Sequence, residues 1–247
     1  MKIGAQLYTV RDFSKSLDAL SETLAKIADI GYEYVQVSGV CDFDGEWMKN
    51  ELAKNGLKAP ITHTAPDKIV GTTEQVIADH KTFGADYVGI GWYALLEKGS
   101  DSFIETFKDA SRTISASGLS LSYHNHDFEF AKGRSGKLFF DEIADAFTPE
   151  ELKFTLDTFW VQAGGADPIE WLKKLKGRTP CIHLKDMSYG RKMSVVGEGN
   201  MNFDGILDTA VNCGVDYAFV EQDDCNGEDP FACLRRSYEF LKSRGFK

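Results

Sequence analysis

Apolar and polar positions follow two alternating patterns along this chain. Short runs rich in β-branched and aromatic residues end near a polar residue, and stretches with apolar residues three or four positions apart follow them. The first pattern is typical of strands and the second of amphipathic helices. We therefore predict strands at residues 3–8, 34–37, 57–63, 86–91, 119–124, 153–157, 181–184 and 217–221.

Helix signals fill the intervals between these strands. Ser16 precedes a helical pattern that Gly31 closes, and aspartate–proline pairs at 167–168 and 229–230 place a capping carboxylate before a proline at the first helical position. The remaining predicted helices end at glycines or in polar segments. They cover residues 46–54, 73–83, 102–115, 138–147, 204–212 and 231–242.

Strands that alternate with helices indicate an α/β fold with a parallel sheet. Closure of eight strands into a barrel accounts for their number and leaves no open edge, and 247 residues match the usual size of such a barrel. We therefore predict a single (β/α)8 TIM barrel, with one domain over residues 1–247. An open, doubly wound sheet is the alternative.

Composition and charge disfavour several classes of function. The formal charge of −10, from 28 basic and 38 acidic residues without a basic patch, disfavours a nucleic-acid partner. We expect no membrane segment and no secretory signal, hence a cytoplasmic protein. The five cysteines are odd in number and form no Cys-x-x-Cys pair, which favours reduced thiols over disulfides or a structural zinc site.

Four predicted strands have a residue that can bind a metal ion at or next to their last position, namely His124, Asp157, His183 and Glu221. The carboxyl ends of the strands of a parallel barrel meet at one mouth, so residues far apart in sequence come together there. Imidazole and carboxylate groups facing one cavity are suitable ligands for a divalent metal. The sequence thus predicts a metal site at this mouth.

Each of these residues also has a structural interpretation. A lone histidine on an apolar strand is more often a hydrogen-bonded core residue, although His124 and His126 share one strand face. Asp157 can cap a helix, and Glu221 can pair with Lys185 or Arg11 instead of a metal.

Further residues are candidates for substrate contacts. His63, Trp92 and Trp160 lie at or just after predicted strand ends, and aromatic faces suit the apolar faces of a sugar ring, although packing explains them equally well. Lys185 and Arg11 can orient hydroxyl groups or a developing charge. We interpret Asp223 and Asp224 as loop residues or as supporting hydrogen-bond acceptors.

Several segments resemble the xylose isomerase-like TIM-barrel superfamily, in its sugar phosphate isomerase/epimerase branch. They are YHNHDFEF at 123–130, LDTFWV at 156–161, HLKD at 183–186, VGEGNMNF at 196–203 and VEQDDC at 220–225. The resemblance implies a small-molecule sugar substrate and a divalent cation, most often manganese, with zinc, magnesium or cobalt as alternatives. It also implies ligands Glu, Asp, His and Glu on strands five to eight, of which Asp157, His183 and Glu221 fill the last three places. A homo-oligomer is compatible with the sequence.

The strand-five position departs from the pattern of this branch, because His124 stands where the first glutamate is expected. In epimerases of the superfamily, two metal-bound glutamates flank the reacting carbon, one removing a proton and the other returning it. Glu221 retains one of these catalytic roles, and the other falls to His124, His126 or Glu129. A one-sided set of acid and base groups suits elimination better than epimerisation.

The resemblance therefore predicts an enzyme, a metal-dependent isomerase or epimerase that acts through an enediolate on a keto- or aldo-sugar. A metal-dependent dehydratase or lyase of a cyclic polyol or keto-sugar is the first alternative. A sugar-binding barrel without catalysis is the second. Apurinic endonucleases of the superfamily need more ligands than five histidines readily supply. An acid in the loop at 197–199 would lie where a phosphate would sit, which favours an unphosphorylated sugar.

Overall fold

The strands close into a barrel. In the computed structural model, which describes residues 1–246, eight parallel strands pair in the order β1-β10-β7-β6-β5-β4-β3-β2, and β2 pairs again with β1. This closure confirms the predicted (β/α)8 barrel and excludes the open sheet. The barrel strands are β1 (Lys2–Gln6), β2 (Tyr34–Val37), β3 (Lys58–Thr62), β4 (Tyr87–Ile90), β5 (Ser120–His124), β6 (Leu152–Asp157), β7 (Cys181–Leu184) and β10 (Tyr217–Val220).

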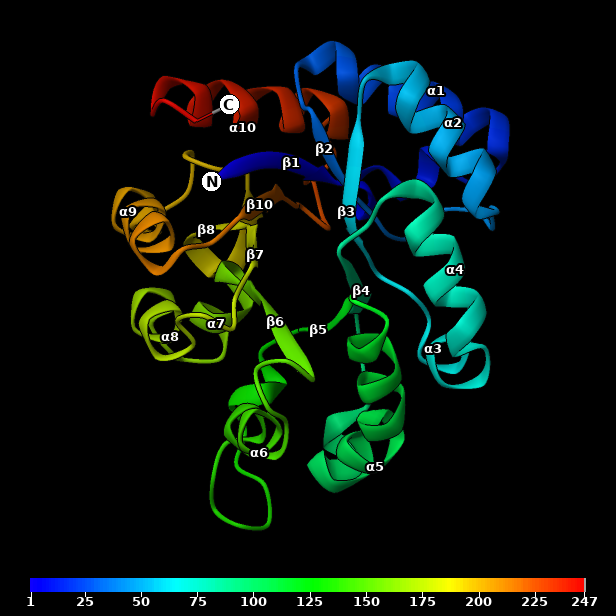
Figure 1. Cartoon of the computed structure of the whole chain (residues 1–247). Helices are drawn as coiled ribbons and strands as arrows, with labels where there is room; N and C mark the ends of the chain where they lie inside the picture. Colours follow the sequence, from blue (N-terminus) through cyan, green and yellow to red (C-terminus); the bar gives the residue numbers. More distant parts are fainter. Residues whose placement is uncertain (247) are drawn as a thin grey trace.

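Helices surround the strands on the outside of the barrel (Figure 1). The predicted caps are present: Ser16 accepts the N–H of Ala19, Gly31 adopts the left-handed conformation, and Asp167 and Asp229 cap helices with proline in the first turn. The helices are α1 (Leu17–Ile30), α2 (Gly45–Asn55), α3 (Pro66–Gly71), α4 (Thr73–Phe83), α5 (Leu95–Ala116), α6 (Phe139–Ala146), α7 (Thr158–Ala163), α8 (Pro168–Lys174), α9 (Phe203–Cys213) and α10 (Pro230–Ser243).

Side chains inside the barrel form an apolar layer and, above it, a polar layer. The apolar layer contains Tyr34, Ile61, Cys181, Tyr217 and Phe219. Because side chains alternate along a strand, the residue two positions later on the same strand, or just past its end, points into the barrel nearer the mouth. In this way Gln36, His63, His183 and Glu221 follow Tyr34, Ile61, Cys181 and Phe219.

The structure differs from the predicted elements in several places. The first strand ends at Gln6 instead of residue 8, because the Gln6 side chain accepts the N–H of Tyr8 and starts the 3-10 helix η1 (Leu7–Phe13). Helix α5 begins before residue 102, with a break at Gly99. Elements without a prediction are α3, α7, the short helices η2 (Phe128–Phe130) and η3 (Tyr189–Arg191), and the antiparallel pair β8 (Asp186–Ser188) and β9 (Lys192–Ser194).

Within residues 1–246, none of the helices combines the length and the apolar character that crossing a bilayer requires.

Candidate metal centre

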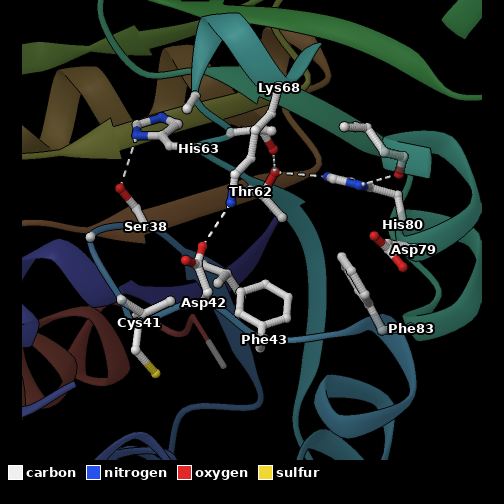
Figure 2. A pocket seen from close by; sticks show the side chains of 16 residues that line it. Ser38, Cys41, Asp42, Phe43, Thr62, His63, Lys68, Asp79, His80 and Phe83 are labelled. Atoms are coloured by element: carbon white, nitrogen blue, oxygen red, sulfur yellow. Dashed lines mark hydrogen bonds and ion pairs between the residues drawn. The ribbon is translucent and has the colours of Figure 1, made fainter. Parts of the chain in front are cut away.

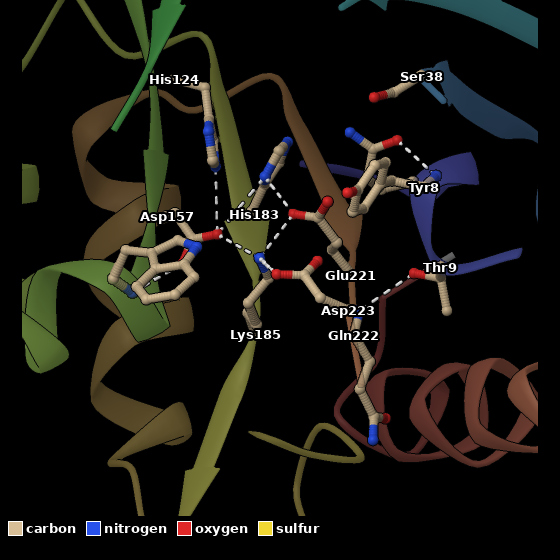
Figure 3. A network of polar contacts seen from close by, with 12 residues as sticks. Tyr8, Thr9, Ser38, His124, Asp157, His183, Lys185, Glu221, Gln222 and Asp223 are labelled. Carbon is tan, nitrogen blue, oxygen red and sulfur yellow. Dashed lines mark hydrogen bonds and ion pairs between the residues drawn. The ribbon is translucent and has the colours of Figure 1, made fainter. Parts of the chain in front are cut away.

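The four residues predicted as metal ligands lie together at the carboxyl end of the barrel. His124, Asp157, His183 and Glu221 are all buried, and one potential ligand atom from each lies within 4.8 Å of the others. Asp157 and His183 are register partners on β6 and β7, and Glu221 directly follows β10 (Figure 3). The fold therefore brings two imidazoles and two carboxylates to one point.

His183 is oriented by a side chain from the opposite part of the barrel. Its Nε2 lies 2.5 Å from Gln36 Oε1, and since an amide oxygen only accepts, Nε2 carries the proton. Its Nδ1 faces Glu221 Oε2 at 2.8 Å and Asp157 Oδ2 at 3.6 Å. Burial lowers the pKa of His183, but the two carboxylates outweigh burial and raise this pKa to about 9. A cation between these atoms would replace that second proton.

His124 is oriented in the same manner. Its Nδ1 lies 3.2 Å from the carbonyl oxygen of Gly91 and donates to it, which leaves Nε2 as the acceptor nitrogen, 3.2 Å from Asp157 Oδ2. Burial, together with His183, lowers the pKa of His124. The neutral ring therefore presents a lone pair to a carboxylate oxygen, and this contact is favourable only with a cation or a proton in between.

Asp157 has a separate function for each of its oxygens. Oδ1 accepts the N–H of Trp160 at 2.9 Å and caps α7, while Oδ2 faces the two imidazoles. Burial would raise the pKa of Asp157, but Lys185 and the histidines hold it well below the usual value. The helix-cap interpretation and the cluster interpretation of Asp157 thus both describe the structure.

The Lys185 ammonium lies among three carboxylates. Its Nζ is 3.1 Å from Asp157 Oδ2, 3.0 Å from Glu221 Oε2 and 3.0 Å from Asp223 Oδ2, and the side chain is 1% exposed (Figure 3). Thr158 fixes the backbone here, because its hydroxyl donates to the Lys185 carbonyl and accepts the Lys185 N–H. One buried ammonium therefore offsets part of the negative charge of these three carboxylates.

The donor set fits a divalent metal. Two imidazole nitrogens and two carboxylate oxygens are ligands that zinc and similar transition metals accept. Metal-binding histidines normally donate their second ring N–H to an acceptor, and both rings do so here, to Gly91 and Gln36. The His124 lone pair directed at Asp157, and the His183 nitrogen whose second proton lies between two carboxylates, both support a cation at this point.

Loss of the Gln36 acceptor should weaken this site. In Gln36→Leu the His183 ring loses the partner of its Nε2–H, so the imidazole is free to change tautomer and to rotate. We expect metal affinity to fall by about 10- to 100-fold, the usual cost of removing such a supporting group. Competition with a metal-chelating dye measures this. Gln36→Glu, which keeps an acceptor, is the matched control, and equal losses in both variants would contradict the assigned tautomer.

Replacement of Lys185 by methionine should tighten metal binding. A unit charge 4 Å from an ion contributes about 4 kcal/mol per charge at an effective dielectric constant near 20, so even a largely relaxed site should gain at least about tenfold in affinity. Without metal, the unpaired carboxylates should lower the free energy of unfolding by roughly 3 kcal/mol. Dye competition and urea unfolding measure the two effects. The exposed Lys192→Met is the control, and weaker binding in Lys185→Met would show that Lys185 supports the ion.

A cavity of about 460 Å³ lies above the cluster and opens to solvent. Trp92, which is 57% exposed, stands at its rim. A Cβ at Gly91 would lie 2.7 Å from His63 Nδ1, so glycine is required there to admit the ring. We call this space the mouth cavity; its lining includes the predicted substrate contacts His63, His126, Lys185 and Trp92, together with Tyr8, Ser38, His124, Glu221 and Asp223.

Besides the buried ligand candidates Asp157 and His183, three predicted site residues lie outside the lining of the mouth cavity. Glu129 is fully buried, and its oxygens accept from the Tyr123 hydroxyl and from the His126 N–H, so it holds the loop that carries His126. Arg11 donates to the carbonyl oxygens of Tyr8 and Asp223. Trp160 lies beneath Lys185, with the Nζ 5.5 Å from the ring centroid. None of these three side chains lines the mouth cavity, so the structure does not support their predicted direct contact with a substrate.

Sequence reasoning missed Gln36, the residue that orients His183. Gln36 is fully buried on β2, and an amide in an otherwise apolar strand is the signal that was available for it. Asp223 was interpreted as a loop residue or a supporting hydrogen-bond acceptor, and it does accept a hydrogen bond from Lys185 and also lines the mouth cavity. Burial and the adjacent Glu221 raise the pKa of Asp223 to about 6.

The loop at 197–199 does bind a buried acid, but that acid is Asp186 of β8 and not a residue of the loop. Asp186 Oδ2 accepts the N–H groups of Gly197 and Gly199 at 2.9 and 3.0 Å, whereas Glu198 pairs with Arg236. The backbone donors that could bind a phosphate are thus already used by the Asp186 carboxylate.

Solved structures with the same architecture were found by comparison of the fold. A sugar phosphate isomerase/epimerase from Parabacteroides distasonis ATCC 8503 superposes with a TM-score of 0.84 at 21% identity, over 98% of this chain and 93% of that chain. Other matching structures are described as a xylose isomerase domain containing protein and as a xylose isomerase-like TIM barrel fusion. The chain has the xylose isomerase-like TIM-barrel fold. The resemblance seen in the sequence is thereby confirmed for the fold.

Two further structures share the xylose isomerase-like barrel. The probable 3-DHS dehydratase AsbF from Bacillus anthracis, involved in petrobactin synthesis, matches with a TM-score of 0.76 at 15% identity, over 99% of this chain and 100% of that chain. The IolI protein with a bound zinc atom matches with a TM-score of 0.72 at 16% identity, over the full length of both chains. No family profile and no curated protein sequence matches this chain. At these identities the structures establish the fold and leave the reaction open.

Proposed function

We propose that this xylose isomerase-like barrel is a divalent-metal-dependent sugar isomerase or epimerase. The observation that carries the proposal is the pair of histidine tautomers: His124 and His183 each donate one ring N–H to a fixed acceptor and direct the other nitrogen at a carboxylate. Such an arrangement is suited to a metal ion at the floor of a cavity large enough for a sugar.

The reaction would begin with removal of a proton from the carbon next to the sugar carbonyl. A divalent ion, when bound, supplies Lewis-acid stabilisation of the enediolate charge. Burial would raise the pKa of Glu221, but Lys185 and His183 hold it well below the usual value, so Glu221 is ionised and can accept the proton. The Lys185 ammonium adds a buried positive charge beside the reacting oxygens.

The second proton-transfer group would come from the histidines of the mouth cavity. Burial lowers the pKa of His126 to about 3 and that of His63 well below 6.5, so both rings are neutral near pH 7. Glu129 serves instead as a positioning residue, because both of its oxygens are occupied by Tyr123 and by the His126 backbone.

Elimination is the second candidate reaction. Glu221 and Asp223 are the carboxylates that line the mouth cavity, and both follow β10, so the acidic groups of this cavity lie on one side of it. Acidic groups on one side only suit loss of water after proton removal. One protein of the same fold is the probable 3-DHS dehydratase AsbF. A metal-dependent lyase acting on a cyclic polyol or keto-sugar would use the same four candidate metal ligands.

Turnover of manganese-loaded protein in deuterium oxide separates these reactions. A panel of unphosphorylated keto- and aldo-sugars should give one product that gains a single deuterium next to the carbonyl with its formula otherwise unchanged. Loss of one water from the product would establish the lyase instead. Absence of exchange and of any bound metal would reject both reactions and leave a sugar-binding barrel. Parallel reactions with phosphorylated sugars test whether the substrate is unphosphorylated, as expected because Asp186 already occupies the backbone donors of the loop at 197–199.

A further inference from the structure

A second cavity lies beside the barrel mouth, outside the ring of strands. It has a volume of about 250 Å³ and lies between the loop at residues 37–43 and the helices α3 and α4 (Figure 2). We call it the side pocket. The mechanism proposed above uses none of the residues that line only this pocket.

The side pocket adjoins the mouth cavity. Ser38, His63, Thr64 and Ala65 line both spaces. His63 stands between them: its Nδ1 lies 3.2 Å from the Ser38 hydroxyl, and its ring centroid is 5.2 Å from that of His124. One imidazole ring therefore separates the candidate metal centre from the side pocket, a span that a substituted sugar can bridge.

Four apolar side chains form one part of the wall of the side pocket. Val40 and Phe43 come from the loop, and Val76 and Phe83 come from α4. The rings of Phe43 and Phe83 meet edge to face, with centroids 6.3 Å apart. This apolar part of the wall, with its aromatic edges, favours contact with a flat apolar group.

Most polar groups that line the side pocket already have partners, the buried Nε2 of His63 being an exception among the described residues. His80 Nδ1 binds the carbonyl of Val76 at 2.7 Å, and His80 Nε2 binds the Thr62 hydroxyl at 2.8 Å. At the rim, Lys68 pairs with Asp42 at 2.7 Å, and Asp79 adds a second carboxylate. Two carboxylates against one lysine disfavour an anionic ligand.

We propose that the side pocket binds an apolar, ring-sized group carried by the sugar, such as a phenyl ring, while the sugar itself occupies the mouth cavity. The position of the sugar in the mouth cavity rests on the proposed function. The binding of the apolar group rests on the side pocket alone. The substrate class is then a sugar linked to an aromatic or similarly compact apolar group.

Benzyl alcohol is a probe for the apolar half. Titration of the full-length protein, followed by saturation-transfer NMR, should give saturable binding in the millimolar range, as expected for a ligand of about eight heavy atoms. Val40→Trp places an indole in the side pocket from a half-buried position and should weaken binding at least about tenfold. The matched control is Val70→Trp, on the exposed side of α3, which should bind as the wild type does.

The same titration after removal of metal with a chelator separates this proposal from the proposed function. Binding of benzyl alcohol should be unchanged, because the side pocket contains none of the four candidate ligands. Thermal unfolding checks that both tryptophan variants are folded, and Val76→Trp on α4 provides a second way to fill the pocket. Non-saturable binding to the wild type, or equal affinities in Val40→Trp, Val76→Trp and Val70→Trp, would overturn the proposal.

Discussion

Asp157→Ala should abolish tight binding of manganese or zinc while the barrel remains folded. The change removes one of the two carboxylates of the cluster, and the loss should exceed the roughly 100-fold cost of removing a mere supporting group. The lost cap of α7 should cost only about 1 kcal/mol. Metal content after dialysis, dye competition and circular dichroism measure these effects. His183→Ala should behave in the same way.

Asp157→Asn provides a sharper version of this experiment. Asparagine caps helices as well as aspartate does, so this variant keeps the bond to the Trp160 N–H but loses the charge. We expect metal binding to be weakened nearly as much as in the alanine variant, with α7 intact. The exposed Asp12→Ala serves as control. Wild-type metal content in both Asp157→Ala and His183→Ala would reject the ligand assignment.

Glu221→Gln should lower the rate of proton exchange by about 10²- to 10⁴-fold at saturating metal, the usual contribution of a general base. Glutamine retains an oxygen near the cluster but cannot accept the proton. Deuterium incorporation from solvent is the readout. High metal concentrations are required, because Glu221 is also a candidate ligand and its replacement should lower the metal affinity as well.

Glu129→Gln is the matched comparison for this variant. Glu129 is a buried carboxylate of the same loop as His126, and burial raises its pKa to about 7, but it does not line the mouth cavity. We therefore expect a much smaller loss of exchange than in Glu221→Gln. A loss in Glu129→Gln as large as that in Glu221→Gln would identify Glu129 as the second catalytic group.

The barrel was predictable because its signals are local. Strand runs, the Ser16 cap, the Gly31 closure and the two aspartate–proline pairs each depend on a few neighbouring residues. The convergence of the four candidate ligands follows from parallel topology, since strand ends of a closed barrel meet at one mouth. The sequence therefore contains both the architecture and the main residues of the centre.

Features that depend on contacts between distant segments were not predictable. Gln36 and His183 are 147 residues apart, and their hydrogen bond requires β2 and β7 to face each other across the barrel. The position of the Lys185 ammonium among three carboxylates depends on the Thr158 hydroxyl that fixes its backbone. Helix α7 and strands β8 and β9 are too short for a periodic pattern to reveal them.

The double use of the Asp157 carboxylate has an evolutionary consequence. Asparagine would preserve the start of α7 but not the negative charge, and glutamate would preserve the charge on a side chain one methylene longer. Drift at this position is therefore constrained by folding and by chemistry at the same time. Lineages that lose the metal should still retain a capping residue here, whereas positions 124 and 183 would be free to diverge.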